Sequence, residues 1–341
     1  MPDPARPGPV PAWLGRLAEP VYAAVIGARN RRFDRGRGVE RVPVPVVSIG
    51  NLSVGGTGKT PIVGVVVSML RAAGVRTAIA LRGYARGAHA PDGDEAALYR
   101  SVLPGVPVIV GPDRAASIRR HLHEHGPLGA VVLDDGFQHR RLARDLDLVL
   151  VDASRGPLAG QRLLPAGWLR DPPAALARAH GVIITHAEAV AGTELASLSA
   201  QISALHGRPP LAVTRHAWAG LADESERRVP TSALSGQRVV AACAIGNPGP
   251  FLRMLAASGA RVQERIILPD HDPLGPRTVR RIGDAARRRL ADAIVVTEKD
   301  WTKLARAGAW PCPVLRPRLV VDVLSGEEAL RRLVLGVARP G

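Results

Sequence analysis

The sequence predicts an α/β fold with a mainly parallel sheet and a second, smaller α/β domain. Short apolar runs alternate with helical stretches along most of the chain, as they do where strands and crossover helices follow one another. Aromatic residues make up only 3% of the chain, so the core is built mainly from Val, Leu, Ile and Ala, which suits buried parallel strands. A chain of 341 residues is also long for a single core, and two domains are expected.

A polar, charge-rich region from Pro209 to Gln237 lacks a clean hydrophobic period, and we place the change of domain there. The prediction is a start segment over 1–40, a larger α/β domain over 41–215 and a smaller α/β domain over 216–341. The expected strands are 44–49, 76–81, 130–133, 146–151, 181–185, 211–214, 239–245, 261–268, 293–297 and 318–323.

Composition narrows the class of protein. Hydrophobic residues make up 46% and charged residues 22% of the chain, as in folded globular proteins. The net charge of +16 suits nucleic acid, an anionic membrane or a phosphorylated substrate as partner. Almost all of the basic residues are arginines, however, and compositional bias explains the charge equally well. Charge by itself therefore decides nothing.

The compartment follows from the cysteines and from the start of the chain. Cys243 and Cys312 cannot form a disulfide framework and neither sits in a metal-type pair, so a reducing compartment is the default. The start shows no secretory signal, and no stretch approaches the roughly 20 apolar residues that span a bilayer. We expect a protein that is cytosolic or lies on a membrane surface.

The start segment combines an apolar helical pattern with a basic end. Residues 1–11 are rich in Pro and are expected to be disordered, and Pro20 should break or kink the helix or open a second one. The pattern predicts a helix lying on a bilayer surface, and a helix packed on the domain itself is the alternative. The apolar positions are Trp13, Leu14, Leu17, Val21, Ala24, Val25 and Ala28, and the basic ones are Arg29, Arg31, Arg32, Arg35 and Arg37.

The strongest local motif is Ser53-Val-Gly-Gly-Thr-Gly-Lys-Thr60. It follows the expected strand 44–49 and precedes the apolar stretch 62–70, which is the strand–loop–helix context of a P-loop. Its glycines let backbone N–H groups curl around phosphate oxygens at a helix N-terminus. The motif predicts a P-loop NTPase-like domain, with Lys59 on the β and γ phosphates and the Thr60 hydroxyl on Mg²⁺. The expected nucleotide-binding set is Ser53, Val54, Gly55, Gly56, Thr57, Gly58, Lys59 and Thr60.

A pair of acidic residues, Asp134 and Asp135, directly follows the expected strand 130–133. Ligands of this fold class bind at the carboxyl ends of the parallel strands, where such a pair would lie beside the P-loop. Two carboxylates there suit Mg²⁺ or a positioned water, although one of them could simply cap the next turn. Asp152 also ends a strand, and for that residue a structural role is at least as good an interpretation.

Three further clusters are weak on spacing alone. Arg82 ends a strand ahead of Gly93-Asp94-Glu95, which is ordinary turn chemistry. His271, in Pro269-Asp-His-Asp272, could be a base, a partner for a base or an ordinary exposed histidine. Thr297-Glu-Lys-Asp300 superficially matches the guanine-reading motif of GTPases, but its Lys is out of place.

Taken together, these motifs resemble the tetraacyldisaccharide 4'-kinases of lipid A biosynthesis, and the resemblance covers nearly the whole chain. The P-loop and the Asp-Asp-Gly-Phe-Gln-His motif are the specific part. In order, the matching segments are Val47-Ser-Ile-Gly-Asn51, Gly55-Gly-Thr-Gly-Lys-Thr-Pro61, Arg82-Gly-Tyr84, Gly93-Asp-Glu95, Asp134-Asp-Gly-Phe-Gln-His139, Leu164-Pro-Ala-Gly167, Gly246-Asn-Pro248, Pro269-Asp-His271 and Thr297-Glu-Lys-Asp300.

The resemblance implies a kinase that uses ATP and Mg²⁺ to phosphorylate the 4'-hydroxyl of a tetraacyldisaccharide 1-phosphate, which yields lipid IVA. It implies an enzyme that is peripheral on the cytoplasmic face of the inner membrane and bound there through the N-terminal helix. We also expect a monomer, with no nucleic acid as partner. The resemblance also implies Asp94 as general base and His271 as its helper. The remaining implied catalytic residues are Lys59, Arg114, Arg170 and Asp135, with Gln138 and His139 in the same motif, and the implied metal set is Thr60, Glu95 and Asp134.

The chain departs from the family pattern at three positions. Asp171 stands where the family usually has Glu, Asp272 where a second His is common, and Ala85 where Gly is frequent. The shorter carboxylate at Asp171 keeps the charge but moves it by about one methylene. None of these changes touches the P-loop.

Two other functions are open to this sequence. One is a soluble P-loop kinase or GTPase acting on a small metabolite, which would not bind vesicles. The other is an arginine-rich NTPase acting on nucleic acid, whose binding would be steeply salt-dependent. The scarcity of aromatic residues for base stacking argues against the second.

Overall fold

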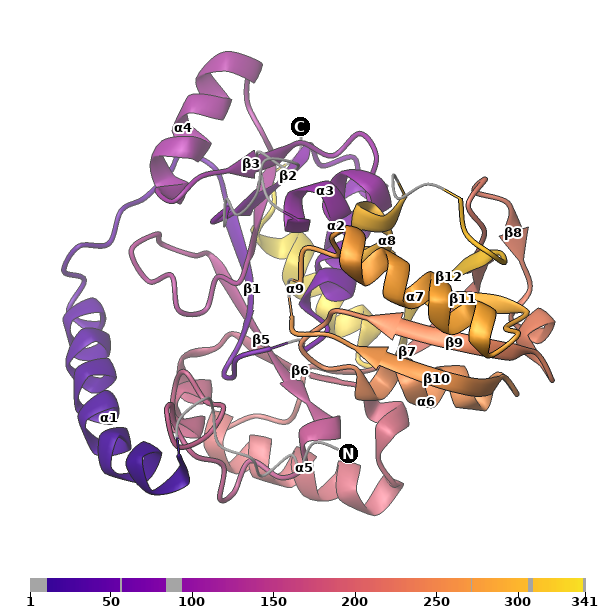
Figure 1. The fold of residues 1–341 in the computed structure, drawn as a ribbon. Coiled ribbons are helices and arrows are strands. Elements are labelled where there is room, and N and C mark those ends of the chain that lie inside the picture. The colour runs from indigo at the N-terminus through magenta and orange to yellow at the C-terminus, as the bar shows by residue number, and fades with distance from the viewer. Residues whose placement is uncertain (1–10, 56, 84–93, 271, 306–308, 340–341) are drawn as a thin grey trace. The chain divides into compact units, whose positions relative to one another are not determined.

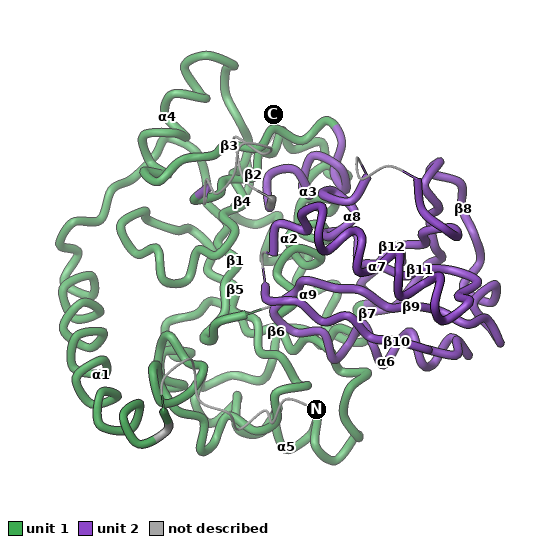
Figure 2. The backbone as a smooth tube through the Cα atoms, viewed as in Figure 1, with its two compact units in different colours: residues 1–82, 105–215, 323–341 green, residues 83–104, 216–322 purple. Residues whose placement is uncertain are grey.

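The structure, a computed structural model, describes residues 11–55, 57–83, 94–270, 272–305 and 309–339. The backbone forms two compact units (Figure 2). Unit 1 comprises Met1–Arg82, Gly105–Arg215 and Val323–Gly341, and unit 2 comprises Gly83–Pro104 and His216–Asp322. The units are thus interleaved in sequence, whereas the expected domains are continuous, because contacts in space do not have to follow chain order.

Unit 1 is built on a parallel sheet with the strand order β7-β6-β5-β1-β4-β2-β3, to which β7 contributes its first residues (Figure 1). Its central strands are buried along their whole length, as expected for parallel strands covered on both faces. The strands are β1 (Val46–Asn51), β2 (Thr77–Leu81), β3 (Val108–Val110), β4 (Ala130–Asp134), β5 (Leu146–Asp152), β6 (Gly181–Thr185) and β7 (Ala212–Ala222).

The helices of unit 1 cover both faces of this sheet. The connection through α2 runs from β1 toward β2, and the one through α4 runs back from β3 to β4, so right-handed crossovers place the two helices on opposite faces. The direction in which successive strands are added therefore reverses next to β1, at the kind of point where α/β sheets bind ligands. The helices are α1 (Ala12–Asp34), α2 (Lys59–Ala72), α4 (Arg114–His125), α5 (Gly192–His206) and α9 (Glu327–Val337), with 3₁₀ turns at Ala153–Arg155, Pro173–Arg178 and Ala187–Ala189.

One close approach in the core of unit 1 brings the motif after β4 against β1. A Cβ atom at Gly50 would lie only 2.5 Å from Cβ of Phe137 and 2.6 Å from its backbone nitrogen. Phe137 is fully buried there, in a cluster with Val149, Val182 and Ile202. Glycine at position 50 is what allows Phe137 to dock beside the end of β1.

Helix α1 lies against unit 1 with one side and leaves the other side open. The Glu19 carboxylate accepts hydrogen bonds from the backbone nitrogen of Leu163 at 2.8 Å and from Nε of Arg162 at 2.8 Å. Helix α1 runs continuously through Pro20, so the expected break does not occur there. Among the described residues, no helix combines the length and the apolar character needed to cross a bilayer.

In unit 2 the strand order is β10-β9-β11-β12-β7, and β8 is antiparallel to β7. Alternate residues of β9 serve two cores: Val240 packs with Ile282 of α7, and Val239 packs with Leu255 of α6. The elements are α3 (Asp94–Val102), β8 (Arg228–Val229), a 3₁₀ turn at Thr231–Leu234, β9 (Arg238–Cys243), α6 (Gly249–Ala257), β10 (Arg261–Ile267), α7 (Pro276–Arg288), β11 (Ala293–Val296), α8 (Glu298–Leu304) and β12 (Val314–Ser325).

The expected α/β class and parallel sheet are confirmed, and the expected strands differ from the observed ones mainly at their ends. Strands β3 and β8 are missing from the prediction because each is very short. Strand β7 runs on to Ala222, well into the region that shows no clean hydrophobic period in the sequence. The prediction missed this second half because its residues alternate only partly between buried and exposed positions.

Candidate phosphate-binding site

The loop between β1 and α2 has the backbone of a phosphate-binding loop. Gly55 and Gly58 have φ angles of 90° and 78°, a left-handed region that glycine enters without strain, and Gly58 caps α2. The backbone N–H of Val54 donates to the carbonyl of Trp168 at 2.8 Å, and the Thr185 hydroxyl donates to the carbonyl of Thr57 at 3.0 Å. These two hydrogen bonds hold the loop on either side of Gly56, just before the start of α2. Gly56 itself lies outside the described residues.

Lys59 is the first residue of α2, and its ammonium group contacts two oxygens. It donates to Oδ1 of Asn51 at 3.2 Å and lies 3.3 Å from Oδ1 of Asp135. Asn51 is fully buried at the end of β1, and its amide donates to the carbonyl of Ser53 at 2.9 Å. Asn51 therefore connects the lysine to the start of the loop, a role that its place in the sequence motif does not reveal.

The acidic pair lies at the end of β4, as expected. Asp134 is the last residue of the strand and is buried, and one of its carboxylate oxygens accepts a hydrogen bond from the backbone nitrogen of Asp135 at 2.8 Å. Asp135 has a φ angle of 51°, which turns its side chain toward Lys59. Burial alone would raise the pKa of Asp135, but the charges of Lys59 and Arg170 outweigh it and lower that pKa to about 2.

Both predicted arginines belong to this end of the sheet. Arg170 donates from Nη1 to Oδ2 of Asp135 at 2.8 Å. Arg114 is buried at the start of α4 and donates to the carbonyls of Asp134 at 3.0 Å and Asp135 at 3.3 Å. Arg114 thus holds the backbone of the acidic pair, and Arg170 holds one of its carboxylates.

Asp171, the residue after Arg170, carries a second buried carboxylate in addition to that of Asp134. Its side chain accepts hydrogen bonds from Gln138 at 3.0 Å and from Asn30 of α1 at 3.0 Å, and it lies 3.3 Å from a guanidinium nitrogen of Arg178. The Arg178 guanidinium in turn stacks over the Phe137 ring, 3.4 Å from its centroid. Neither Asn30 nor Arg178 has a motif that would mark it in the sequence.

His139 is neutral in this setting. Burial lowers its pKa, and the neighbouring charges of Arg114, Arg144 and Arg141 lower it further, to about 4.

Asp152, at the end of β5, has a structural contact: it caps the following turn by accepting a hydrogen bond from the backbone nitrogen of Ser154 at 2.9 Å. The structural interpretation of Asp152 therefore holds.

The other predicted site residues belong to unit 2. Asp94 and Glu95 are the first two residues of α3, and His271 lies outside the described residues. The residues on either side of position 271 contact α8: Lys299 pairs with Asp270 at 2.9 Å, and Lys303 donates to the carbonyl of Asp272 at 2.8 Å.

The segment Thr297-Glu-Lys-Asp300 has structural contacts of its own. The Thr297 hydroxyl accepts a hydrogen bond from the backbone nitrogen of Asp300 and so caps α8. The Asp300 carboxylate accepts from the backbone nitrogen of Ala244 at 3.1 Å. This geometry is that of a helix cap and not of a guanine-reading loop.

The residues at the end of β1 and β4 fit a nucleotide and a magnesium ion. Left-handed glycines, a helix N-terminus and Lys59 are the groups that hold phosphates. Thr60, the second residue of α2, and Asp134 offer a hydroxyl and a carboxylate, the oxygen ligands that a hard cation takes. The donor set therefore suits Mg²⁺ and a triphosphate at the same place.

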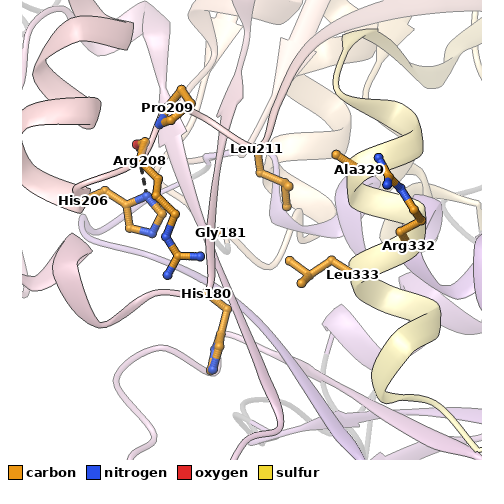
Figure 3. Close-up of a pocket in the computed structure, with 9 residues that line it drawn as sticks. All are labelled: His180, Gly181, His206, Arg208, Pro209, Leu211, Ala329, Arg332 and Leu333. Carbon is orange, nitrogen blue, oxygen red and sulfur yellow. Dashed lines mark hydrogen bonds between the residues drawn. The ribbon is translucent and has the colours of Figure 1, made fainter.

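A separate cavity of about 340 Å³ lies at the opposite edge of the sheet, at the amino ends of β6 and β7 (Figure 3). Its lining includes His206, whose ring nitrogens lie 3.3 Å from the carbonyl oxygen of Arg208 and 3.0 Å from that of Ala179. Both ring nitrogens are thereby occupied by backbone carbonyls. This cavity belongs to the packing of α9 on the sheet and not to the phosphate-binding loop.

Comparisons of this chain with known proteins all point to one family of kinases. The family model for tetraacyldisaccharide-1-P 4'-kinase matches residues 11–336. The tetraacyldisaccharide 4'-kinase of Anaeromyxobacter dehalogenans strain 2CP-1 is 42% identical over 350 residues, covering 95% of this chain and 91% of the relative. That of Chromobacterium violaceum is 37% identical over 326 residues, covering 89% of this chain and 90% of the relative. The crystal structure of LpxK from Aquifex aeolicus in complex with ATP has a TM-score of 0.71 at 28% identity, covering 94% of this chain and 97% of that one.

Proposed function

The chain belongs to the tetraacyldisaccharide-1-phosphate 4'-kinase family, and on that premise we propose how its residues carry out the family's reaction. The activity is that of a kinase: the γ-phosphate of ATP passes to the 4'-hydroxyl of the acylated disaccharide 1-phosphate. The observation that carries the proposal is that Lys59, at the start of α2, contacts both Asn51 at the end of β1 and Asp135 at the end of β4.

In this reaction a bond forms between the 4'-oxygen and the γ-phosphorus, and the bond from that phosphorus to the β–γ bridging oxygen breaks, which releases ADP. Phosphoryl transfer needs little covalent chemistry from the protein, so positioning and charge neutralisation dominate. Lys59 and the loop amides hold the phosphates, and Lys59 exchanges its contact with Asp135 for the γ-phosphate. Arg170 and Arg114 offset the charge that develops there.

Mg²⁺, when bound, neutralises charge on the β and γ phosphate oxygens. We assign its protein ligands to Thr60, Glu95 and Asp134. The support for Thr60 and Asp134 is that a hydroxyl and a buried carboxylate stand at the start of α2 and at the end of β4. Glu95, in unit 2, is assigned on the family resemblance.

The proton of the 4'-hydroxyl goes to Asp94, with His271 as its helper, again on the family resemblance. A nucleophilic hydroxyl benefits from a base, and such groups contribute roughly 10²- to 10⁴-fold to a rate. Asp94 is the first residue of α3 in unit 2, and His271 lies outside the described residues.

We also propose that α1 places the enzyme peripherally on the cytoplasmic face of the inner membrane, with the acylated substrate. Trp13, Leu17 and Val21 leave 66%, 68% and 66% of their surfaces exposed, which is unusual for large apolar side chains. The arginines at the other end of the helix, including Arg31 and Arg32, suit an anionic surface. An apolar stripe beside a basic end is what an interfacial helix presents.

The reaction is tested by transfer of labelled γ-phosphate from ATP to purified acylated disaccharide 1-phosphate in detergent. Removing Lys59 takes away a charge that acts on the transferred phosphate, so Lys59→Ala should lose about 10²- to 10³-fold in kcat. Arg119→Ala on α4, which removes an exposed ion pair with Glu40, is the matched control and should keep the wild-type rate. Labelled product at the wild-type rate in Lys59→Ala would overturn the assignment of the loop.

A further inference from the structure

The side of α1 that faces unit 1 carries two polar residues directed at the site. Tyr22 and Asn30 are both half-buried on this side, while Leu17 and Val25 of the same helix are 68% and 60% exposed. Eight positions separate Tyr22 from Asn30 in the sequence, so the two side chains stand about two turns apart on one face of the helix. Their partners are residues of the site and not of a remote surface.

The route from Asn30 reaches Lys59 through a series of hydrogen bonds, one of which ends on the backbone carbonyl of Asn51. Asn30 donates from Nδ2 to Oδ1 of Asp171 at 3.0 Å, and the amide of Gln138 donates both to Oδ2 of Asp171 at 3.0 Å and to the carbonyl of Asn51 at 2.8 Å. Asn51 then accepts from Nζ of Lys59 at 3.2 Å. Asp171 is only 1% exposed, so its hydrogen bonds are shielded from solvent. Buried polar groups are costly to leave unpaired.

The route from Tyr22 reaches the same lysine from the other side. The Tyr22 hydroxyl donates to the backbone carbonyl of Arg170 at 3.1 Å, and the guanidinium of Arg170 donates to Asp135 at 2.8 Å. The other oxygen of Asp135 lies 3.3 Å from Nζ of Lys59. Two separate routes therefore begin on one face of α1 and end on the phosphate-binding lysine.

The backbone between these routes is also shared. Arg170 and Asp171 are consecutive, and both of their backbone nitrogens donate to the carbonyl of Leu52, at 2.7 Å and 3.3 Å. Leu52 precedes the loop, so the segment held by α1 also supports the start of the loop. A displacement of this segment moves Arg170 and the loop together, and misplacement of catalytic groups by about 1 Å can cost 10²-fold in rate.

We propose that Asn30 and Tyr22 are positioning residues for phosphoryl transfer: through Asp171 and Arg170 they hold Lys59 and the guanidinium of Arg170 where the transferred phosphate meets them. The inference rests on the proposed function, since it names residues that support that same site. The helix that presents an apolar face to a lipid surface is then also part of the frame of the phosphate site.

The test uses the full chain with Asn30→Ala and with Tyr22→Phe, which removes only the hydroxyl group. We expect kcat to fall about tenfold for Asn30→Ala and several-fold for Tyr22→Phe, within the range known for misplaced catalytic groups, while the KM for the acylated acceptor stays within twofold. The affinity for Mg²⁺-ATP, measured by titration calorimetry, should fall as well, because Lys59 is less well held.

Glu19→Ala is the matched control. Glu19 also fixes α1 to unit 1, through Arg162 and the backbone of Leu163, but it takes no part in either route to Lys59. If Glu19→Ala lowers kcat and Mg²⁺-ATP affinity as much as Asn30→Ala, then loose docking of the helix explains the effect and the proposal is wrong. Wild-type kcat and Mg²⁺-ATP affinity in both Asn30→Ala and Tyr22→Phe would overturn it as well.

A double-mutant comparison tests the route itself. Asn30 and Gln138 act on the same carboxylate, so Asn30→Ala combined with Gln138→Ala should lose clearly less than the product of the two single losses. Fully multiplicative losses would contradict a shared route. The nucleotide-binding measurement needs no lipid acceptor, so it still decides this proposal if the wild-type enzyme leaves every acylated acceptor unmodified, in which case only the proposed substrate fails.

Discussion

Lys59 and Asp135 face each other at the carboxyl ends of β1 and β4, with 3.3 Å between the ammonium nitrogen and a carboxylate oxygen. One residue comes from the loop and the other from the acidic pair, and more than 70 residues of sequence separate them. The strands β1 and β4 are direct neighbours in the sheet, with Ile49 opposite Asp134, so their ends must meet. The phosphate-binding charge and its acidic counterpart are thus brought together by sheet register.

The general base can be tested by removing it. Asp94→Ala should lower kcat by about 10²- to 10⁴-fold, because the acceptor hydroxyl would lose its proton acceptor. The measurement is single-turnover transfer of labelled phosphate at saturating ATP. If His271 acts only through Asp94, then Asp94→Ala with His271→Ala should be little slower than the slower single variant, and a near wild-type rate for Asp94→Ala would reject the assignment.

Acid should weaken the fold through His139. Its pKa in the folded protein is about 4, below the ordinary value of 6.5, so between these two pH values the unfolded chain binds the proton more readily. The free energy of unfolding should therefore fall as the pH drops from about 6.5 toward 4, and this group should add no further loss below that window.

Urea unfolding of the wild type and of His139→Gln at pH 7 and pH 5 checks this expectation. The wild type should lose more stability than His139→Gln between the two pH values, because the variant cannot take up the proton. His123→Gln, at a position in the last turn of α4 for which no such burial applies, serves as the control and should follow the wild type. Equal losses in the wild type and in His139→Gln would contradict the buried, neutral state.

The close approach at Gly50 should tolerate no side chain. In Gly50→Ala the new Cβ would meet Phe137 at 2.5 Å, so the protein should be destabilised by about 1–3 kcal/mol, the usual range for overpacking. Activity should fall too, because Phe137 belongs to the segment that carries Asp134 and Asp135. Chemical denaturation gives the first effect and phosphate transfer the second.

Gly64→Ala is the matched control for this prediction. It lies within α2, where an added Cβ would have no neighbour within 4 Å, so the change should stabilise the protein by about 0.5–1 kcal/mol. A loss of stability at Gly64 similar to that at Gly50 would show that helix α2 and not the Phe137 contact is the sensitive element.

Vesicle binding should depend on the exposed apolar side of α1. Leu17→Asp replaces a leucine whose burial in a membrane surface contributes about 1.5–3 kcal/mol, so binding to anionic vesicles in a sedimentation assay should weaken at least tenfold. Leu290→Asp, at an equally exposed leucine just beyond the end of α7, should bind like the wild type. The same weakening in both variants would mean that α1 has no special role, and in detergent both should keep their activity.

Much of the site could be predicted from the sequence because its parts are local. The strand, the glycines, Lys59 and the start of α2 are consecutive, and the sequence pattern carries each of their roles. The pair after β4 could also be placed, since the carboxyl ends of neighbouring parallel strands lie at one edge of a sheet. The roles of Asp94, Glu95 and His271 remain predictions, and His271 lies outside the described residues.

The α/β class, the phosphate-binding loop and the family could all be predicted from the sequence alone, because these depend on short-range patterns of glycine, charge and hydrophobic period. Two contacts could be found only in the folded chain: Asn30 donates to Asp171, 141 residues away, and Tyr22 donates to the carbonyl of Arg170, 148 residues away. No periodicity marks such pairs, because a single hydrogen bond between distant residues leaves no repeating pattern in either segment. The packing of α1 on unit 1 creates those contacts, and with them the support for Lys59.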